Sequence, residues 1–417
     1  MSRRPRPSRV TLAAAAVTAV GLAVTGCSGT DLGLTPSSAD EQGSAADGAS
    51  DEETEPAPEP QAVITANVAA ESEVPVSKFV RIKVDAGSLD KVVVRQRGTK
   101  GKKGRLPGNM DISKEKWRAS SRLEPGVKYV LKAKATDDQG LVTKQKQRFT
   151  AEDLALSEQT YASIAPVDGS TVGVGMPVIV KFDVPVQRKK AFEKRMSVEN
   201  SSNQKGAWRW LSDYEAHWRP KSYWKAGTQV DVSIDVNSVP AGNGVYGQMD
   251  REASFTIGDR RIIKVDLATK QVTHVVNGNV AATMPFSGGK PGFETRSGTK
   301  VIIEKFREKR MDAATTGISE DDPEYYNIED VEYAMRLTYS GEFIHAAPWS
   351  VGSQGSANVS HGCTGLSTAN AGYLYNNTII GDVVETTGSS RYMTLTNGYG
   401  DWNVGFKEWK QGSALAG

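Results

Sequence analysis

Short stretches of alternating apolar and polar residues recur along the chain after Pro60. Between residues 61 and 150 they are separated by turn sequences such as Asp137-Asp138-Gln139-Gly140 and cover residues 61–69, 78–85, 91–96, 127–136 and 141–150. A period of two places successive side chains on opposite faces, which is the pattern of a β-strand buried on one side. Residues 63–152 are therefore predicted to form an immunoglobulin-like β-sandwich, called the first sandwich below.

A second set of strand patterns predicts another immunoglobulin-like sandwich over residues 160–258, the second sandwich. Pro185 and Pro220 interrupt this set, whose strands are expected at residues 171–182, 207–210, 229–236 and 253–257. Four tryptophans fall close together here: Trp208, Trp210, Trp218 and Trp224. We expect most of them to pack in the core or against the next domain, rather than to form a ligand platform, because buried aromatic side chains dominate such packing.

The pattern from residue 260 onward predicts a third domain, again rich in β-structure. Two runs flanking residues 268–270 read as a hairpin, residues 262–266 and 272–276, and further strands are expected at residues 299–304, 343–345 and 382–386. One helix is predicted over residues 368–375, with Ser367 or Thr368 as its cap. The chain is thus expected to be mainly β, with a C-terminal domain over residues 259–388 and a C-terminal extension over residues 389–417.

The N-terminus carries the features of an export signal. Four arginines precede an apolar run from residue 11 to residue 24, which is too short for a transmembrane helix. The run ends in Val24-Thr25-Gly26-Cys27, which resembles the lipobox of bacterial lipoproteins and implies a signal peptide over residues 1–26 and a lipid on Cys27. The alternative is an ordinary secretory signal with an incidental cysteine.

Charge is distributed unevenly along the chain. Residues 28–60 contain nine acidic side chains and no Lys or Arg, whereas residues 61–417 contain 47 basic and 40 acidic side chains. The acidic stretch lacks aromatic residues and cannot bury a core, so residues 27–62 are predicted to be a disordered tether. The mild positive charge of the remainder does not indicate a nucleic-acid partner. A basic cluster at residues 91–105 is interpreted as a solvated hairpin, although it could touch an anionic wall polymer.

One thiol stands out as a candidate nucleophile. The chain has two cysteines, and lipidation of Cys27 would leave Cys363 as a single thiol outside the cytoplasm. His345 and His361 bracket a Gly/Ser-rich loop that leads to Cys363, so a histidine could return to the thiol and act as its base. Gly362 would allow backbone N–H groups to form an oxyanion hole.

Other interpretations of these residues remain open at this point. Cys363 could be buried and inert, or it could pair with Cys27 in a disulfide. His345, His361 and Cys363 are zinc-ligand types, but a fourth ligand is not evident, and we expect no metal and no cofactor. The remaining histidines, His217 and His274, are expected to be structural.

The segment from His345 to Ser360-His361-Gly362-Cys363 resembles the signature of L,D-transpeptidases with a YkuD-type catalytic domain. Residues 168–178, 339–345 and 400–403 resemble the mycobacterial-type members of that family. The resemblance covers nearly all of residues 60–417. It implies two immunoglobulin-like modules, a β-rich catalytic domain and a short C-terminal extension.

The resemblance also assigns roles to residues of the loop and of a substrate lid. It implies that Cys363 attacks a carbonyl, that His345 accepts the thiol proton, and that the carbonyl of Ala346 orients the imidazole. Backbone N–H groups of His361, Gly362 and Cys363 would hold the oxyanion. Four further residues are expected to contact the substrate: Met311 and Tyr326 (or its neighbour Tyr325) in the lid, and Trp349 and Ser360 in the segment from His345 to Cys363.

The implied reaction is a transpeptidation between peptidoglycan stem peptides. A tetrapeptide donor would lose its terminal D-Ala, and the diaminopimelate side chain of an acceptor stem would resolve the thioester. Carbapenems would inactivate the enzyme, which would sit at the outer face of the cytoplasmic membrane, in the cell wall. The family usually has Asn or Arg where this chain has Gly365, so a carboxypeptidase and a catalytically weak wall-binding scaffold remain the alternatives.

Overall fold

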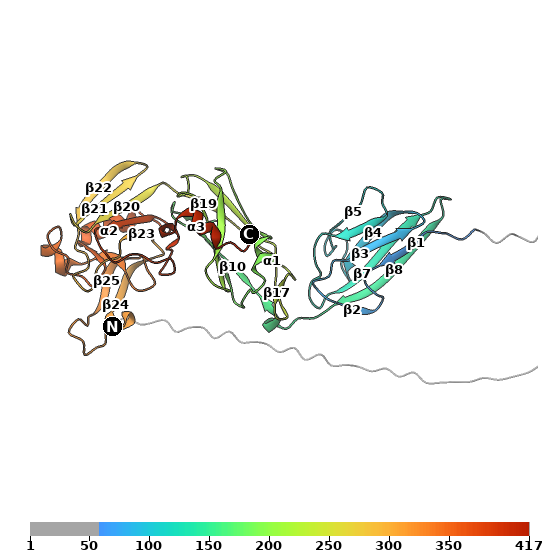
Figure 1. Cartoon of the computed structure of the whole chain (residues 1–417), viewed down its shortest axis with the longest axis horizontal. Helices are drawn as coiled ribbons and strands as arrows, with labels where there is room; N and C mark the ends of the chain where they lie inside the picture. Colours follow the sequence, from blue (N-terminus) through green and yellow to red (C-terminus); the bar gives the residue numbers. More distant parts are fainter. Residues whose placement is uncertain (1–57, 417) are drawn as a thin grey trace, which may run out of the picture. The chain divides into compact units, whose positions relative to one another are not determined.

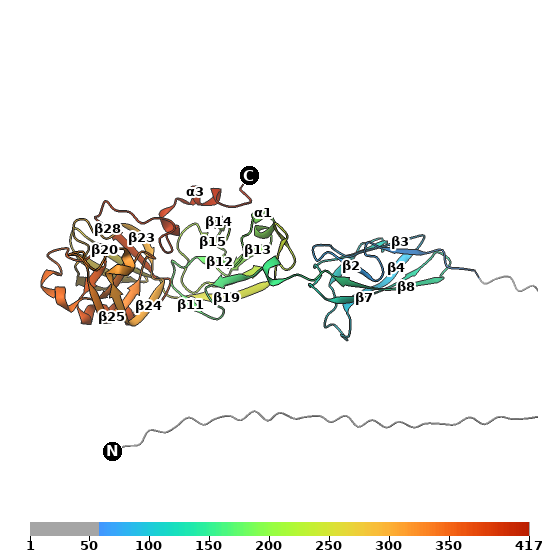
Figure 2. The ribbon, with the colours of Figure 1, turned by 90° about the horizontal axis from the view of Figure 1, so that it is seen from below.

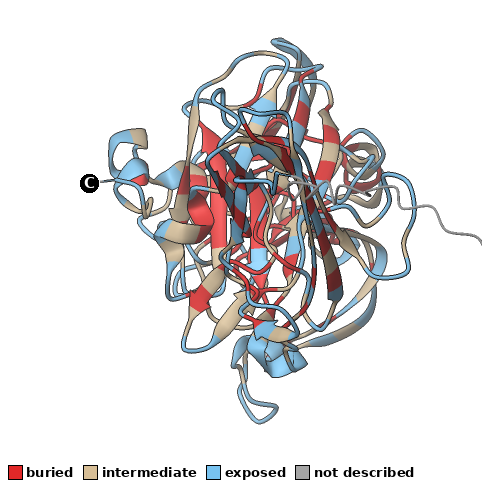
Figure 3. Ribbon diagram, turned by 90° about the vertical axis from the view of Figure 1, so that its right-hand side faces the viewer, coloured by how far each residue is buried: buried red, intermediate tan, exposed pale blue. Residues whose placement is uncertain are grey.

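The computed structural model describes residues 58–416, and its regular structure is mainly β (Figure 1). The predicted signal peptide, Cys27 and most of the predicted tether lie outside the described residues. None of the helices in residues 58–416 is long and apolar enough to cross a membrane. Strands of the sandwiches are banded in buried and exposed residues, as an alternating pattern requires (Figure 3).

The first sandwich consists of two four-stranded sheets, with strand orders β1-β3-β6-β5 and β2-β8-β7-β4. Its strands are β1 Val63–Ala66, β2 Ser72–Val74, β3 Arg81–Asp85, β4 Ser88–Gln96, β5 Gly108–Met110, β6 Lys116–Ala119, β7 Lys128–Thr136 and β8 Val142–Ala151. All five expected strands are present with shifted ends. The three strands that the pattern did not predict, β2, β5 and β6, have only three or four residues, too few to display a period.

The second sandwich comprises two four-stranded sheets and a small three-stranded one, with orders β10-β12-β15-β14, β11-β19-β16-β13 and β17-β18-β9. Its elements are η1 Leu156–Glu158, β9 Gln159–Thr160, β10 Ala162–Ala165, β11 Thr171–Val172, β12 Val178–Phe182, α1 Lys189–Glu193, β13 Met196–Asn200, β14 Gly206–Trp210, β15 Glu215–Pro220, β16 Gln229–Ile234, β17 Pro240–Gly242, β18 Val245–Gly247 and β19 Arg251–Ile257. All four tryptophans lie in its buried core, which confirms the packing interpretation.

One expectation for the second sandwich is wrong. The predicted strand over residues 171–182 is broken, because Gly173 and Gly175 leave the sheet to donate hydrogen bonds to the carbonyls of Ile380 and Gly381 in the C-terminal domain. A Cβ on Gly173 would lie 2.2 Å from the backbone nitrogen of Asp382, so only glycine permits this approach. Pro220 is the last residue of β15, which agrees with the expectation that it interrupts the set of strands.

The C-terminal domain contains a five-stranded sheet, β22-β21-β20-β28-β23, and a four-stranded sheet, β24-β25-β26-β27. Its elements are β20 Arg261–Asp266, β21 Gln271–Val276, β22 Asn279–Pro285, β23 Gly298–Val301, β24 Glu304–Asp312, η2 Ala313–Thr316, β25 Asn327–Arg336, β26 Phe343–Ala346, η3 Pro348–Ser353, β27 Thr364–Leu366, α2 Thr368–Asn376 and β28 Val383–Thr387. The predicted hairpin is β20–β21, and Ser367 caps α2 by accepting a hydrogen bond from the Asn370 N–H.

The predicted strand over residues 299–304 is also wrong in its extent. β23 ends at Val301 and pairs with β28, whereas β24 begins at Glu304 and pairs with β25 in the other sheet. Ile302 and Ile303 are both buried where the chain passes from one sheet to the other. A continuous apolar run cannot reveal such a change of sheet, because its side chains are buried on both sides of the crossing.

The C-terminal extension returns to the second sandwich (Figure 2). It contains η4 Asp401–Asn403 and α3 Phe406–Gln411. The indole N–H of Trp402 donates to the carbonyl of Gly175 at 2.7 Å, and that of Trp409 donates to Ala207 at 2.9 Å. His217, which is 1% exposed, contacts Asp401 Oδ1 and Glu215 Oε1, each at 2.8 Å. His217 is therefore a structural link between the sandwich and the extension.

We expect the attachment of the extension to weaken as pH rises from about 6.5 to about 9. Burial alone would lower the pKa of His217, but the two carboxylates outweigh it and raise the pKa to about 9. A cation with a raised pKa stabilises the fold fully below its unfolded pKa of about 6.5, and that stabilisation is lost as pH passes the folded value. The unfolding midpoint of the wild type should therefore fall over this range.

The matched variant for this prediction is His217→Gln, whose side chain stays neutral throughout. It should show a lower midpoint at pH 6.5 and a much flatter dependence up to pH 9. If the unfolding midpoints of the wild type and of His217→Gln changed equally with pH, the prediction would be contradicted.

Candidate active site

The parallel pairing of β26 with β27 places the candidate base His345 near the segment that ends at the candidate nucleophile Cys363. This segment, residues 360–363, is called the nucleophile loop below. In this register His345 lies opposite Gly365. Cys363 precedes Gly365 by two residues, so its side chain falls on the same face of the sheet as that of His345. Both side chains line one pocket of about 350 Å³. Two residues 18 positions apart in the sequence thus line the same pocket because the segments that carry them are neighbours in the sheet.

The pocket also gathers the residues expected to contact the substrate. Its wall includes the four residues Met311, Tyr326, Trp349 and Ser360, together with His361. Met311 belongs to β24, and Tyr326 immediately precedes β25, so both come from the hairpin whose tip, residues 311–326, is the expected lid. The alternating pattern had not predicted this hairpin, and Ile328 and Val359 are pocket residues that sequence reasoning missed.

Protonation of the two reacting groups follows from their surroundings. Burial raises the pKa of the Cys363 thiol to about 12, so the thiol is neutral at physiological pH. Burial lowers the pKa of His345, so the imidazole is neutral as well. Its Nδ1 lies 2.7 Å from the carbonyl of Ala346, which can only accept, so Nδ1 carries the proton. Nε2 of His345 is therefore the unprotonated nitrogen available as a base.

The loop before the thiol is held by its own hydrogen bonds. The Ser360 hydroxyl donates to the carbonyl of Cys363 at 2.7 Å and accepts from the Gly362 N–H at 3.2 Å. Gly362 has φ of 120°, which favours glycine. The Cys363 thiol donates to the carbonyl of Gly341 at 3.6 Å. Ser360 thus shapes the loop in addition to lining the pocket.

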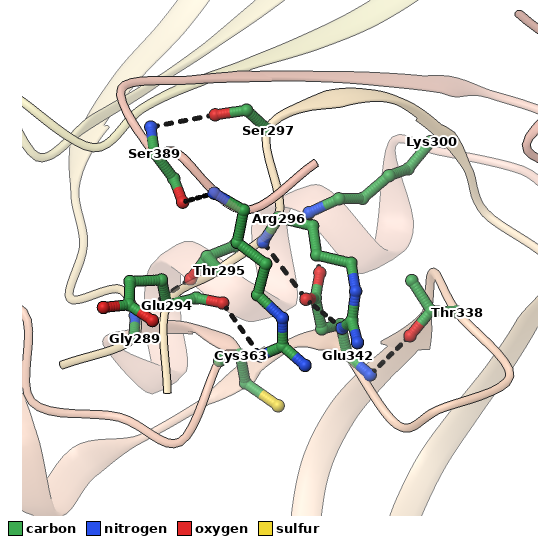
Figure 4. Close-up of polar contacts among 12 residues, drawn as sticks. Gly289, Glu294, Thr295, Arg296, Ser297, Lys300, Thr338, Glu342, Cys363 and Ser389 are labelled. Atoms are coloured by element: carbon green, nitrogen blue, oxygen red, sulfur yellow. Dashed lines mark hydrogen bonds and ion pairs between the residues drawn. The ribbon is translucent and has the colours of Figure 1, made fainter. Parts of the chain in front are cut away.

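A buried cluster of charges lies next to the nucleophile loop (Figure 4). Lys300, which is fully buried, has its Nζ 2.8 Å from Oε2 of Glu342. The other oxygen of Glu342 accepts hydrogen bonds from the guanidinium of Arg296 at 2.7 Å and from its backbone N–H at 3.1 Å. A Cβ on Gly362 would lie 3.7 Å from Cγ of Glu342, so this carboxylate packs directly against the loop.

Sequence reasoning missed this cluster for a clear reason. Lys300 and Glu342 are 42 positions apart, and an alternating strand pattern does not distinguish a buried lysine from a solvated one. Burial lowers the pKa of Lys300, and the charge of Glu342 opposes that effect.

Glu324 connects the lid to the nucleophile loop. Its Oε2 lies 2.7 Å from Nε2 of His361 and also pairs with Lys290. These partners hold the pKa of Glu324 below its usual range. The ring centroids of Tyr326 and Phe293 lie 5.0 and 4.7 Å from that of His361. The side chain of His361 is therefore an anchor for the lid, a role that the sequence did not suggest.

We expect Glu324→Gln to loosen the lid and to raise KM about threefold, with a smaller change in kcat, because exposed ion pairs contribute only modestly. Steady-state kinetics and hydrogen exchange of residues 313–326 would measure both effects. Glu320→Gln, which removes the same charge from the same segment, is the control and should leave KM unchanged. An identical response of the two variants would show that charge alone, rather than the contact with His361, matters.

Among residues 58–416 there is no cluster of three or more His, Cys, Asp or Glu side chains arranged to hold a metal ion.

Comparisons with known proteins agree on one family. Residues 260–386 match the model of the L,D-transpeptidase catalytic domain (YkuD), and residues 71–240 match a bacterial Ig domain model (Big_10). L,D-transpeptidase 2 of Mycobacterium tuberculosis is 36% identical over 314 residues, which cover 75% of this chain and 76% of that protein. L,D-transpeptidase 1 of the same species is 36% identical over 227 residues, covering 54% of this chain and 84% of that protein.

A solved structure titled as LdtMt1 in complex with imipenem is 35% identical, covers 54% of this chain and 98% of that chain, and has a TM-score of 0.49. The relatives' identity and coverage, taken with a thiol and an imidazole on one face of a YkuD-type sheet, establish the family. This chain belongs to the L,D-transpeptidases.

Proposed function

We propose that this enzyme cross-links two peptidoglycan stem peptides through their third residues, with Cys363 as nucleophile and His345 as general base. The observation that carries the proposal is that both side chains line the pocket of about 350 Å³ from the same face of the β26–β27 pair. The donor is a tetrapeptide stem, and its terminal D-Ala is the leaving group.

The first half-reaction begins from a neutral thiol and a neutral imidazole. As Sγ of Cys363 attacks the carbonyl of the third residue, its proton passes to Nε2 of His345, and the carbonyl oxygen becomes an oxyanion. The protonated imidazole then donates that proton to the departing amine of D-Ala, leaving a thioester on Cys363. The Nδ1–H bond to Ala346 keeps the ring oriented throughout and stabilises its transient positive charge.

Oxyanion stabilisation is assigned to backbone N–H groups of residues 361–363. The Gly362 N–H donates to Ser360 at 3.2 Å, a long bond that the oxyanion can replace. In the second half-reaction the side-chain amine of an acceptor's third residue loses a proton to His345 and attacks the thioester. The new amide forms, and the thiol is regenerated.

Gly365 is the feature that keeps alternative functions in view. It lies opposite His345 and lines the pocket, and a Cβ there would lie 3.0 Å from Cβ of Ala347 and 3.7 Å from Oγ of Ser350. The absence of a side chain widens the pocket at this wall. Water could then resolve the thioester more readily, giving a carboxypeptidase, or substrate could be held too loosely for turnover, leaving a wall-binding scaffold.

The experiment that separates these functions is mass spectrometry of the full chain incubated with disaccharide-tetrapeptide. Dimers joined through the third residues, with D-Ala released, support the proposal. Tripeptide without dimer identifies a carboxypeptidase. Unchanged substrate, with a thiol that resists alkylation, identifies a scaffold.

We further propose that carbapenems acylate Cys363. The support is the imipenem complex of the 35%-identical relative and the placement of a single thiol in the pocket. Intact-mass analysis of the folded enzyme should show one adduct. The Cys363→Ala variant should show none, and an adduct on that variant would assign the reaction to another group.

We also propose that the enzyme is a lipoprotein on the outer face of the cytoplasmic membrane, within the cell wall. The support is the arginine-rich start, the apolar run and the sequence that ends at Cys27. Cys27→Ser should move the protein from the membrane fraction to the soluble fraction after cell lysis. Retention of this variant in the membrane fraction would contradict the proposed lipidation of Cys27.

A further inference from the structure

The outer face of the sheet β2-β8-β7-β4 in the first sandwich is strongly basic. It forms a groove of about 850 Å³ whose lining contains eight cations and no carboxylate, namely Lys91, Arg95, Arg97, Lys132, Lys134, Lys144, Lys146 and Arg148. Only three of these belong to the cluster noted in the sequence. The others come from β7, which pairs with β4, and from β8, which pairs with β7, and they lie 35 to 57 positions further along the chain.

The strand register places several of these cations directly opposite one another. Lys134 of β7 faces Lys91 of β4 on one side and Lys144 of β8 on the other, and Lys132 faces Lys146. Opposing Cβ atoms in such pairs are about 5 Å apart, so like charges repel and destabilise the sheet. A surface that only had to be solvated would be more stable with mixed charges.

Little in the described chain compensates this repulsion. Among the eight cations of the groove, one ion pair is present within residues 58–416, between Lys134 and Asp90 at 3.0 Å. An extended ligand with repeated negative charges would relieve the repulsion along all three strands at once. Strand spacing of about 4.8 Å and residue spacing of about 6.7 Å along each strand make the groove a regular array of single positive charges.

The chemistry of the groove narrows the class of polyanion. Lysine and arginine both bind phosphate, arginine in a bidentate manner. The floor includes the aliphatic side chains of Val93 and Val130, and the lining contains no aromatic side chain. Proteins that bind single-stranded nucleic acid rely on aromatic side chains to stack the bases, so this groove fits a polymer without bases.

We propose that the first sandwich binds a linear polyol-phosphate or sugar-phosphate polymer in this groove. Binding would hold the enzyme on an anionic polymer of its surroundings, in addition to its contact with stem peptides. The proposal is independent of the catalytic chemistry at Cys363.

The test is titration of the full chain with poly(glycerol phosphate) of defined length, followed by fluorescence anisotropy between 50 and 300 mM salt. The wild type should bind, and its affinity should fall steeply with salt because counterions are released. The triple variant Lys132→Gln, Lys144→Gln, Lys146→Gln should bind at least about tenfold more weakly, with a shallower salt dependence.

Two matched variants control for total charge and for the fold. Lys205→Gln, Lys221→Gln, Lys225→Gln removes the same charge from exposed positions of the second sandwich and should leave binding within about twofold of the wild type. Lys132→Arg, Lys144→Arg, Lys146→Arg keeps the charge and should retain binding. Because the Gln substitutions remove repulsion, the groove variant should unfold at no lower temperature than the wild type.

Three results would overturn the proposal. One is equal weakening in the groove and control variants. Another is tighter binding of single-stranded DNA of matched charge, which would assign the groove to nucleic acid. The third is binding of the polymer only after the nine carboxylates of residues 28–60 are replaced by amides. That result would mean that the chain's own acidic segment occupies the basic groove. The Cys363→Ala variant should bind the polymer with the same affinity as the wild type. Polymer binding and catalysis are therefore tested independently of each other.

Discussion

Replacing Cys363 by Ala should abolish both release of D-Ala and formation of the cross-link while leaving the fold intact. The Cys363 thiol lines the same pocket as His345, and the thioester cannot form without it. Loss of the nucleophile in acyl-transfer enzymes lowers kcat on the order of 10⁴-fold or more, and we expect at least that reduction here. Product analysis by mass spectrometry measures it directly.

Cys363→Ser is the informative companion to this variant. Serine keeps the size of the side chain but is a much weaker nucleophile when its only base is a neutral imidazole, so its activity should also be nearly absent. His345→Gln should retain the thiol and its alkylation but lose proton transfer, with a decrease of about 10² to 10⁴-fold. Full activity of any of the three variants would refute the assigned chemistry.

Replacing Glu342 by Val should destabilise the C-terminal domain by about 3–5 kcal/mol, because it leaves buried positive charges uncompensated. The ammonium group of Lys300 would lose its ion-pair partner Glu342, and because the side chain is completely buried, water could not replace that partner. Arg296 would lose two hydrogen bonds in the same step. Denaturant unfolding, followed by a signal from this domain, measures the change.

The double variant Glu342→Val, Lys300→Met tests the origin of that loss. Removing both charges should recover a large part of the stability, since an apolar pair avoids the cost of burying an uncompensated ion. Glu304→Gln breaks the more exposed pair with Arg336 and should cost no more than about 1 kcal/mol. If the decrease in unfolding free energy of the double variant equalled the sum of the two single decreases, Glu342 and Lys300 would not be energetically coupled.

Much of the architecture could be predicted from the sequence because the relevant signals are local. A period of two identified the longer strands of both sandwiches, and turn residues separated them. The Ser367 cap and the apolar positions of α2 marked the single helix expected in the C-terminal domain. The resemblance around Ser360-His361-Gly362-Cys363 supplied the nucleophile, the base and the lid residues that the structure brings into one pocket.

Other features depend on contacts that no local pattern records. The break between β11 and β12 exists because Gly173 and Gly175 pack against residues 380–382. The passage from β23 to β24 occurs inside a continuous apolar run. The link from His217 to Asp401 joins residues 184 positions apart.

By itself the sequence determined the class of fold and the family, and it led to Cys363 and His345 as the proposed reacting residues, because periodicity, turn chemistry and a short motif are properties of neighbouring residues. Only the tertiary structure decided the protonation of Cys363 and His345, the buried Lys300–Glu342 pair and the basic groove of the first sandwich. The physical reason is that burial and the electrostatic field at a side chain are set by whichever strands pack around it, and those strands are distant in the chain.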